Sequence, residues 1–365
     1  MDTDKRLASL DTLRGFDMLF ISGLGWLIVA VCSLFPGGVD CWLAGEMGHV
    51  EWNGWTHHDT IFPLFLFIAG ISFPFSYAKQ QAAGASRGRI YRKIVFRALA
   101  LFGLGLLYNG ILRLHLDSVR FYSVLARIGF AWMFAALLFI NFKPRTRAVI
   151  AVAILIGYNL LCTIPAPDVP GADPLSKDGC LAGYIDRCLM SGHLCYGNFD
   201  PEGLLSLLPS IVTAMLGMFT GEWVRKQNVS GGRKTACMLA AAAVLFVLGY
   251  IWSIWFPINK KLWTSSFVLV VGGFSLASFA LFYWIIDVKG HSKWAFPLRV
   301  VGMNSIAIYM LPSIIDVGYT KDFFFGGFIA LCSPQWASVL SAATYLIVIW
   351  SMMYFLYKQK IFLKV

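Results

Sequence analysis

Charged side chains are scarce in this sequence. Asp, Glu, Lys and Arg make up 13% of its 365 residues, whereas a soluble globular domain carries about 25%. Hydrophobic residues reach 58%, more than one core of this length can hide from water, which excludes a soluble protein. The alternating stretches of about ten residues that form transmembrane strands are also missing. The apolar runs are continuous and about 20 residues long, enough for a helix to cross about 30 Å of hydrocarbon, so the sequence predicts an all-α, polytopic membrane protein.

Apolar segments predict about ten transmembrane helices in a single domain over residues 1–365. These segments lie at about 15–35, 60–78, 94–112, 123–142, 148–165, 204–223, 236–256, 263–286, 300–317 and 335–357. If both termini are cytoplasmic, 20 of the 30 Lys and Arg residues fall in inner segments and seven in outer segments, while Arg14, Arg97 and Arg127 lie within or at the ends of spans. Because cytoplasmic loops carry an excess of Lys and Arg, we expect both termini to be cytoplasmic.

The same topology explains the formal net charge of +11. No tract has the composition of a basic arm that binds nucleic acid, so we expect no nucleic-acid partner. The first ten residues are polar and do not form a signal peptide, in which a basic start leads directly into a short apolar stretch. We therefore expect the first span to remain in the mature protein.

Two outer segments, at about 36–59 and about 166–203, are too long to be simple turns. Long structured loops often carry function. Cys180, Cys188 and Cys195 lie in the second segment, where an oxidising periplasm would permit a disulfide among them. The alternative is that the three thiols are free and buried, and their spacing does not favour a metal site.

Ionisable side chains within or beside the spans form two groups. Each costs about 2.5–3.5 kcal/mol to insert at the centre of a membrane helix, so each needs a partner or a purpose. The inner group consists of Asp11, Arg14, Arg92, Lys93 and Arg97. The outer group consists of His49, Glu51, His57, His58, Asp59, Arg127, Asp200, Glu202, Lys260 and Lys261.

His49 is the main catalytic candidate in the outer group. A neutral imidazole accepts a proton near neutral pH, and Asp59 could orient it, as acyl transfer requires. One alternative is a loop histidine at the membrane interface. Another is a metal site built from His49, His57, His58 and Asp59, but the adjacent His57 and His58 seldom both reach one ion, and the chain has no HxxxH or HExxH pattern.

Other polar residues have two interpretations each. Asp200 and Glu202 could bind sugar hydroxyls or an ammonium group, or cap the following helix. In the segment INKKLW, Asn259, Lys260, Lys261 and Trp263 could form an edge of a substrate site, or belong to an aromatic belt at the interface. The inner basic cluster of Arg87, Arg89, Arg92 and Lys93 could bind a phosphorylated cofactor, or serve topology alone.

Nine segments, in order along nearly the whole chain, resemble the heparan-alpha-glucosaminide N-acetyltransferase family and its bacterial relatives. They are SLDTLRGFDM (9–18), HVEWNGWTHHDTIFPLFLFIAGIS (49–72), SVLARIGFAW (123–132), AGYIDRCL (182–189), HLCYGNFDPEGLL (193–205), INKKLWTSSFV (258–268), DVKG (287–290), GMNSIAIY (302–309) and KIFLKV (360–365). Members of this family are multi-pass enzymes that take acetyl from acetyl-CoA on the cytosolic face and deliver it to the amine of a terminal glucosamine on the opposite face.

The resemblance implies roles for individual residues. The family's active-site histidine precedes the WNG motif and falls on His49, and the aspartate before the FP pair falls on Asp59. An oxyanion stabiliser is also needed, and Asn53 or Asn304 could donate that hydrogen bond. The expected substrate-binding residues are Trp52, Arg127, Asp200, Glu202, Asn259, Lys260, Trp263 and Asn304. The expected acetyl-CoA-binding residues are Asp11, Arg14, Arg92, Lys93 and Arg97, because Arg and Lys bind phosphates well.

The resemblance further implies a multi-pass protein of the bacterial inner membrane with no metal. Its expected partners are the lipid bilayer and an amino-sugar acceptor, and a homodimer is left open. The chain departs from the animal enzyme in three ways. We expect it to lack the large N-terminal lumenal region with its leading span. Its outer loop near Cys180 is shorter, and Tyr309, Met310, Leu311 and Pro312 follow the MNS motif where a histidine is expected.

The rival prediction is an inner-membrane transporter for an amino sugar such as N-acetylglucosamine. A transporter favours broken spans, a site at the midplane and repeat symmetry. The sequence shows no repeat, and its polar motifs cluster at the two faces of the membrane. His49 discriminates between the two functions, because acyl transfer requires its imidazole and sugar permeation does not.

Overall fold

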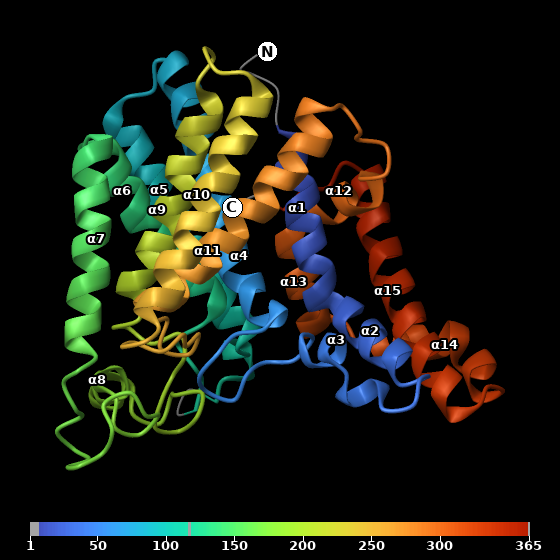
Figure 1. Cartoon of the computed structure of the whole chain (residues 1–365). Coiled ribbons are helices and arrows are strands. Elements are labelled where there is room, and N and C mark those ends of the chain that lie inside the picture. The colour runs from blue at the N-terminus through green and yellow to red at the C-terminus, as the bar shows by residue number, and fades with distance from the viewer. Residues whose placement is uncertain (1–6, 116–117, 364–365) are drawn as a thin grey trace.

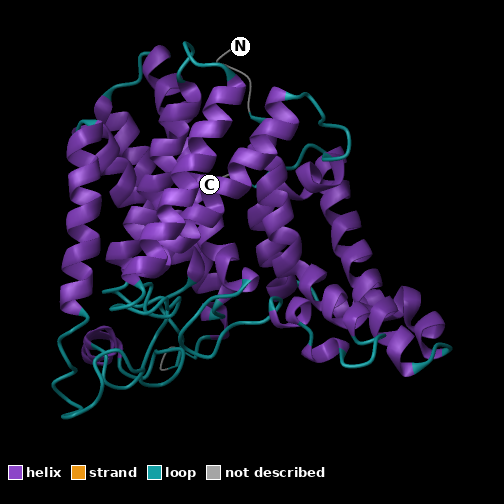
Figure 2. Cartoon of the chain, viewed as in Figure 1, coloured by secondary structure: helices purple, strands orange, loops and turns teal. Residues whose placement is uncertain are grey.

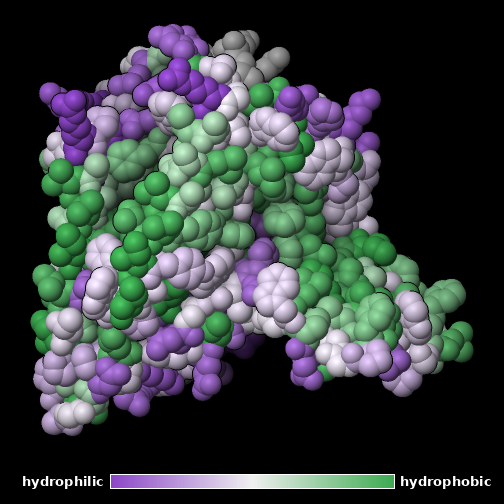
Figure 3. Space-filling model, in the orientation of Figure 1, coloured by the Kyte–Doolittle hydropathy of each residue, from purple (hydrophilic) through white to green (hydrophobic). Residues whose placement is uncertain are grey.

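The computed structural model describes residues 7–115 and 118–363. Every element of regular secondary structure in these ranges is a helix (Figure 1 and Figure 2). Apolar side chains form a band across the middle of the molecule, and polar side chains gather at its two ends (Figure 3). The predicted class, an all-helical membrane protein, is therefore confirmed.

Eight helical segments within the described residues are long and apolar enough to cross a membrane. They are Ala8–Cys32, α4 (His57–Ala82), α6 (Val124–Asn141), α7 (Pro144–Leu161), α9 (Leu207–Arg225), α10 (Gly231–Trp252), Ser265–Val288 and α15 (Pro334–Lys358). The first comprises α1 (Ala8–Leu19), a π-helical turn (Phe20–Leu24) and α2 (Gly25–Cys32), and the seventh joins α11 (Ser265–Phe282) to a second π-helical turn (Tyr283–Val288). The predicted total of about ten spans stays a prediction, as does the side on which the termini lie.

The two other predicted spans are helical but differ from the rest. The segment at 94–112 is covered by α5 (Arg87–Tyr108), a helix of 22 residues whose basic residues reduce its hydropathy. The segment at 300–317 is divided into α12 (Phe296–Gly302) and α13 (Ser305–Ile314). Short helices complete the fold: α3 (Trp42–Gly45) and α8 (Leu181–Met190) lie in the two predicted outer loops, and α14 (Val317–Ala330) precedes α15.

The first span begins at Ala8 rather than near residue 15, because the polar stretch of residues 8–14 is also helical. This inner part of α1 packs against α12 at two glycines. A Cβ atom on Gly15 would overlap the carbonyl oxygen of Leu298, and a Cβ atom on Gly302 would overlap that of Asp11. Helices in membranes approach closely where small residues face each other.

Serine and threonine side chains begin several of the helices. Ser123 accepts the N–H of Ala126 at the start of α6, and Thr264 accepts the N–H of Phe267 at the start of α11. Ser86 caps α5 in the same way. These caps satisfy N–H groups that have no partner within the helix.

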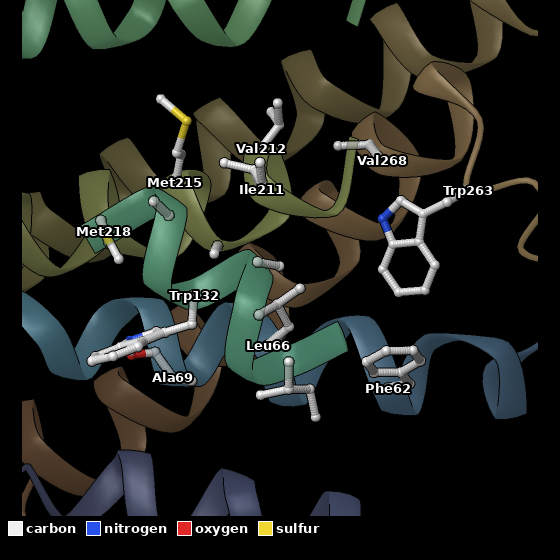
Figure 4. Packing of buried hydrophobic residues seen from close by; sticks show 14 of the residues in the cluster. Phe62, Leu66, Ala69, Trp132, Ile211, Val212, Met215, Met218, Trp263 and Val268 are labelled. Carbon is white, nitrogen blue, oxygen red and sulfur yellow. The ribbon is translucent and has the colours of Figure 1, made fainter. Parts of the chain in front are cut away.

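The core lies between α4, α6, α9 and α11 (Figure 4). Leu66 and Val270 are fully buried there, and the rings of Phe62 and Trp263 meet edge to face with their centroids 4.9 Å apart. In Figure 1, α4 lies between a group formed by α5 to α11 and a group formed by α1, α12, α13 and α15, and it contacts α1, α6, α9 and α11. Helix α4 therefore connects the two parts of the molecule, and α1 adds a direct contact with α11.

Helices α4 and α9 pack at van der Waals distance through glycines. A Cβ atom on Gly217 would overlap the carbonyl oxygen of Phe67, and a Cβ atom on Gly70 would overlap that of Ala214. Backbone oxygens cannot move aside as a flexible side chain can. The position of α4 against α9 therefore depends on the absence of side chains at Gly70 and Gly217.

This packing predicts that Gly217→Val lowers the free energy of unfolding by about 3 kcal/mol, the upper end of the usual cost of overpacking a core. The measurement is the melting temperature of the purified protein in detergent. Gly157→Val in α7 is the matched control, because a Cβ atom there meets nothing within 4 Å. Equal melting temperatures for the two variants would contradict the role of Gly217.

Candidate active site

The start of α4 is built by a reciprocal cap. Thr56 is the N-cap residue and Asp59 occupies the third helical position, whose carboxylate accepts the N–H of Thr56 at 3.2 Å. This capping box turns the Asp59 side chain back toward the helix N-terminus, where only 1% of it is exposed. The Glu46 side chain accepts the N–H of His57 at 2.6 Å, so the preceding loop is tied to the same helix end.

His49 lies against this buried carboxylate. Its Nδ1 is 2.6 Å from Oδ1 of Asp59, and 53% of its side chain is exposed. An ionised carboxylate can only accept hydrogen bonds, so Nδ1 carries the proton that it donates, and the lone pair of a neutral ring then lies on Nε2. The predicted pair of His49 and Asp59 is brought together in an arrangement suited to a general base.

Lys260 reaches the same carboxylate from the loop between α10 and α11. Its Nζ lies 3.2 Å from Oδ1 of Asp59 and 3.3 Å from Nδ1 of His49. Burial lowers the pKa of the Lys260 ammonium group, whereas the charge of Asp59 acts to raise it. Lys260 is a predicted substrate-binding residue, but its contacts are with His49 and Asp59.

The WNG and INKKLW motifs are joined by their backbones. The N–H of Gly54 donates to the carbonyl of Ile258 at 2.7 Å, and the amide of Asn259 donates to Oδ1 of Asn53 at 3.1 Å. Trp52 donates through its indole N–H to the carbonyl of Leu175 at 2.8 Å, which connects the second outer loop as well. Residues 52–54 are therefore fixed beside His49 from two sides.

His58 lies against His49, and the adjacent His57 contacts the first span instead. The His58 ring meets that of His49 edge to face at 4.5 Å, and the His57 ring lies 4.4 Å from that of Phe20 in the first span. The buried Nδ1 atoms of His57 and His58 have no hydrogen-bond partner among the described residues. Within residues 7–115 and 118–363, no group of three or more His, Cys, Asp or Glu side chains is placed to hold a metal ion.

Asp200 and Glu202 belong to a second polar cluster, centred on Arg120. The guanidinium group donates to Asp200 at 2.7 Å and also contacts Glu202. Asp200 further accepts the N–H groups of Cys195 at 3.0 Å and Glu202 at 2.9 Å. A sugar bound by Asp200 would have to displace one of these donors. Arg120 was not predicted as a site residue. Its position between apolar residues could have indicated a partner carboxylate, because a charged group in such surroundings needs one.

Arg127 and Trp263 lie inside the protein. Arg127 donates to the carbonyl of Gly203 at 3.3 Å and contacts the Ser206 hydroxyl, and its guanidinium carbon is 5.0 Å from the ring centroid of Trp263. The Trp263 indole donates to Thr213 at 3.2 Å, and 1% of the residue is exposed. Any contact of either residue with a substrate would need an opening that reaches this depth.

Asp186 of α8 is fully buried next to this cluster. Burial raises the pKa of its carboxyl group to about 6, although the N–H of Leu204, which donates to it at 3.0 Å, acts in the opposite direction. All eight cysteines are in the described part of the chain and are free thiols. Cys180 is buried, and Cys188 and Cys195 are exposed.

A cavity of about 850 Å³ lies between α1, α4, α5, α6 and the break between α12 and α13. Its charged lining side chains are Asp11, Arg14, Lys79, Arg97 and Arg225. Along α4 it extends from Ala82 to Phe65, which is about 25 Å at 1.5 Å per residue. Asp11, Arg14 and Arg97 were predicted from the sequence. Lys79 and Arg225 were not, because they lie at helix ends, where membrane topology alone explains a basic residue.

A second cavity of about 520 Å³ is lined by Lys79, Arg92, Lys93 and Arg97. Lys79 and Arg97 line both cavities. The guanidinium carbon of Arg97 is 4.3 Å from the ring centroid of Trp132, and its buried Nε has no hydrogen-bond partner within the described residues. All five residues predicted to bind the cofactor therefore line one or both cavities.

Asn304 lies at the break between α12 and α13. Its amide donates to the carbonyl of Ile361 at 2.9 Å and accepts the N–H of Leu363 at 3.1 Å. Its neighbours Met303 and Ser305 line the larger cavity. Asn304 thus holds the C-terminal segment, and Asn53 is the predicted oxyanion donor that lies in the loop of His49.

Comparisons with known proteins all point to one family. The family described as "Heparan-alpha-glucosaminide N-acetyltransferase, catalytic" matches residues 6–257. The mouse (Mus musculus) heparan-alpha-glucosaminide N-acetyltransferase is 28% identical over 85% of this chain and 54% of its own length. The human (Homo sapiens) protein of the same name is 29% identical over 84% of the chain and 52% of its own length. The chain therefore spans about half the length of the curated relatives it matches.

The raised pKa of Asp186 predicts a pH-dependent stability. Between the ordinary value near 3.9 and about 6, the folded state binds a proton that the unfolded chain releases, so the free energy of unfolding falls by up to about 3 kcal/mol as the pH rises through this range. Asp186→Asn removes the titrating group. Its melting temperature relative to the wild type is expected to increase from pH 4.5 to pH 7.

The matched control is Asp40→Asn, because Asp40 is exposed in the first outer loop. Its difference from the wild type is expected to be independent of pH. A constant difference for Asp186→Asn as well would show that the buried carboxyl group does not titrate as described.

Proposed function

This chain belongs to the heparan-alpha-glucosaminide N-acetyltransferase family, and from this membership we propose that it transfers the acetyl group of acetyl-CoA to the amine of a glucosamine-type sugar. The observation that carries the proposal is the position of His49 and Asp59 at one end of α4, while the other end of the same helix lines a basic cavity. In this proposal acetyl-CoA enters from the cytoplasm and the sugar binds on the periplasmic face of a bacterial inner membrane.

The basic cavities fit the donor by charge and by length. CoA carries phosphate groups, which Arg and Lys bind through charge-assisted hydrogen bonds. Lys79, Arg92, Lys93 and Arg97 lie at the inner end, and the unsatisfied Nε of Arg97 offers a donor. Farther along α4 the lining becomes apolar at Phe65, Leu125 and Ile306. The pantetheine arm would follow this direction, toward the catalytic pair.

The catalytic pair supplies the base. An amino-sugar nitrogen ionises near the range of α-amino groups, about 7.7–8.0, and it must be neutral to attack. In direct transfer, the amine nitrogen bonds to the acetyl carbon, the carbon–sulfur bond breaks, and Nε2 of His49 takes a proton from nitrogen and returns it to the thiolate. In a two-step route, Nε2 first accepts the acetyl group itself. Both routes use the lone pair that Asp59 leaves on Nε2.

The acceptor would bind beside the segment 52–54. Asn53 is exposed and uses Oδ1 to accept from Asn259, which leaves its amide nitrogen as a donor for the developing oxyanion. Trp52 offers an aromatic face next to it, and aromatic rings are common in sites that bind small molecules.

We predict that His49→Gln lowers kcat for acetyl transfer by about 10²- to 10⁴-fold, the usual contribution of a general base. His49 is half exposed, so the variant should fold. The assay uses purified protein in nanodiscs with labelled acetyl-CoA and glucosamine, and His291→Gln is the control because His291 is exposed outside the site. If the wild type binds no acetyl-CoA and acetylates no sugar of a panel, but accumulates sugar in proteoliposomes, the transferase proposal fails and transport takes its place.

The two basic cavities, which Arg97 lines, predict a separate effect on the binding of acetyl-CoA. Arg97→Met is expected to raise the KM for acetyl-CoA about 10-fold with little change in kcat, because a hydrogen bond to a charged group contributes about 1.5–3 kcal/mol. Arg145→Met is the matched control, since Arg145 is exposed at the start of α7. An unchanged KM in Arg97→Met would place the phosphates elsewhere.

A further inference from the structure

A buried carboxylate next to an imidazole creates a conflict for a general base. An opposite charge at this distance favours the protonated imidazole, and an imidazolium has no lone pair to accept a proton. The contact between His49 and Asp59 orients the ring, but by itself it would also hold the ring in the inactive, charged form. Some other group has to offset this attraction if His49 is to act near neutral pH.

Lys260 is placed to do so. Its ammonium group lies 3.2 Å from the carboxylate oxygen that His49 contacts and 3.3 Å from His49 Nδ1. A protonated ring would put a second positive charge directly beside the first. The two cations would compete for one oxygen, so the neutral imidazole is favoured.

The backbone fixes Lys260 in this position. Asn259 receives the N–H of Leu262 at 2.9 Å and donates its own N–H to Thr264 at 3.0 Å. The carbonyl of Lys260 accepts the N–H of Trp263 at 3.0 Å, in a turn where Trp263 has a φ of +55°. The Lys260 side chain is 19% exposed. The ammonium group is therefore held by a tight turn and is largely shielded from solvent.

The neighbouring lysine points elsewhere. Lys261 donates to the carbonyl of Glu51, and its ammonium nitrogen lies 5.9 Å from the Trp52 ring centroid and 5.2 Å from that of Tyr196. Two adjacent residues of the same type thus have different surroundings. Only Lys260 meets the catalytic pair.

The other charged and titratable groups around the pair come from four segments. These groups are His57 and His58 of α4, Glu46 of the preceding loop, Glu202 of the second outer loop, and Lys261. Asp59 is the carboxylate in direct contact with Lys260 and His49, and Glu202 acts on Lys260 from a greater distance.

We infer that Lys260 is a positioning residue of the acetyl transfer: its ammonium group shares the Asp59 carboxylate with His49 and keeps His49 in the neutral form that accepts a proton. This inference rests on the proposed function, but its central claim concerns the protonation of His49 and can be measured without catalysis.

The first test follows the reaction of His49 with diethyl pyrocarbonate, with which a histidine reacts only as the neutral imidazole. The rate is measured against pH on the full chain in nanodiscs, and fragment ions in the mass spectrum separate His49 from His57 and His58. In Lys260→Met the midpoint of the profile is expected to move up by about one pH unit, the lower end of the shift produced by a contacting charge. Lys260→Arg keeps the charge and should stay near the wild type, and Lys261→Met should show no shift.

The second test is the pH profile of kcat/KM for acetyl transfer. On the acid side of this profile kcat/KM rises as His49 loses its proton. In Lys260→Met this rise is expected to move to higher pH by the same amount as the pyrocarbonate midpoint, and activity recovers at high pH. A uniform loss at every pH with an unchanged midpoint would make Lys260 merely structural and overturn the inference. Loss of the acid limb would identify Lys260 itself as the base and overturn it as well. If the wild type transfers no acetyl group, the proposed function fails, but the pyrocarbonate profiles still decide whether Lys260 controls His49.

Discussion

The structure depends most on the solvation of one buried carboxylate. An ionised carboxyl group removed from water costs several kcal/mol unless hydrogen bonds replace its hydration. Asp59 receives them from the N–H of Thr56 in its own cap, from His49 in the preceding loop, and from Lys260 in the loop after α10. The same contacts that stabilise the fold at this end of α4 therefore assemble the chemistry. A change in any one donor alters both.

The middle of α4 transmits this arrangement to the rest of the protein. Gly70 and Gly217 allow the backbones of α4 and α9 to touch, and Gly15 and Gly302 do the same for α1 and α12. Contacts of this kind leave no side chain that can change rotamer, so neighbouring helices cannot shift without losing them. The pair of His49 and Asp59 at one end of α4 and the larger cavity toward its other end are consequently held at a constant separation.

The sequence predicted the features that depend on local pattern. Apolar length indicated the helices, and the positions of His49 and Asp59, ten residues apart, made their contact plausible before the fold was known. Features that depend on distant pairing were not predictable. Arg120 meets Asp200 across 80 residues, and Lys260 meets Asp59 across 201. The segment at 300–317 looked continuous because it is apolar, yet it breaks at Asn304, whose amide binds the backbone of residues near the C-terminus.

The depth of the larger cavity changes how the membrane is insulated at this point. The cavity reaches Phe65, and Asp59 lies six residues away on α4, a separation of about 9 Å along the helix. The packed rings of Phe62 and Trp263 lie beside this interval. Where water fills the cavity, the layer between the two aqueous sides is this short stretch of protein rather than a hydrocarbon layer about 30 Å thick. A transmembrane voltage would then fall mainly across this stretch, with His49 and Lys260 at its edge, where moving a charge by a short distance does electrical work.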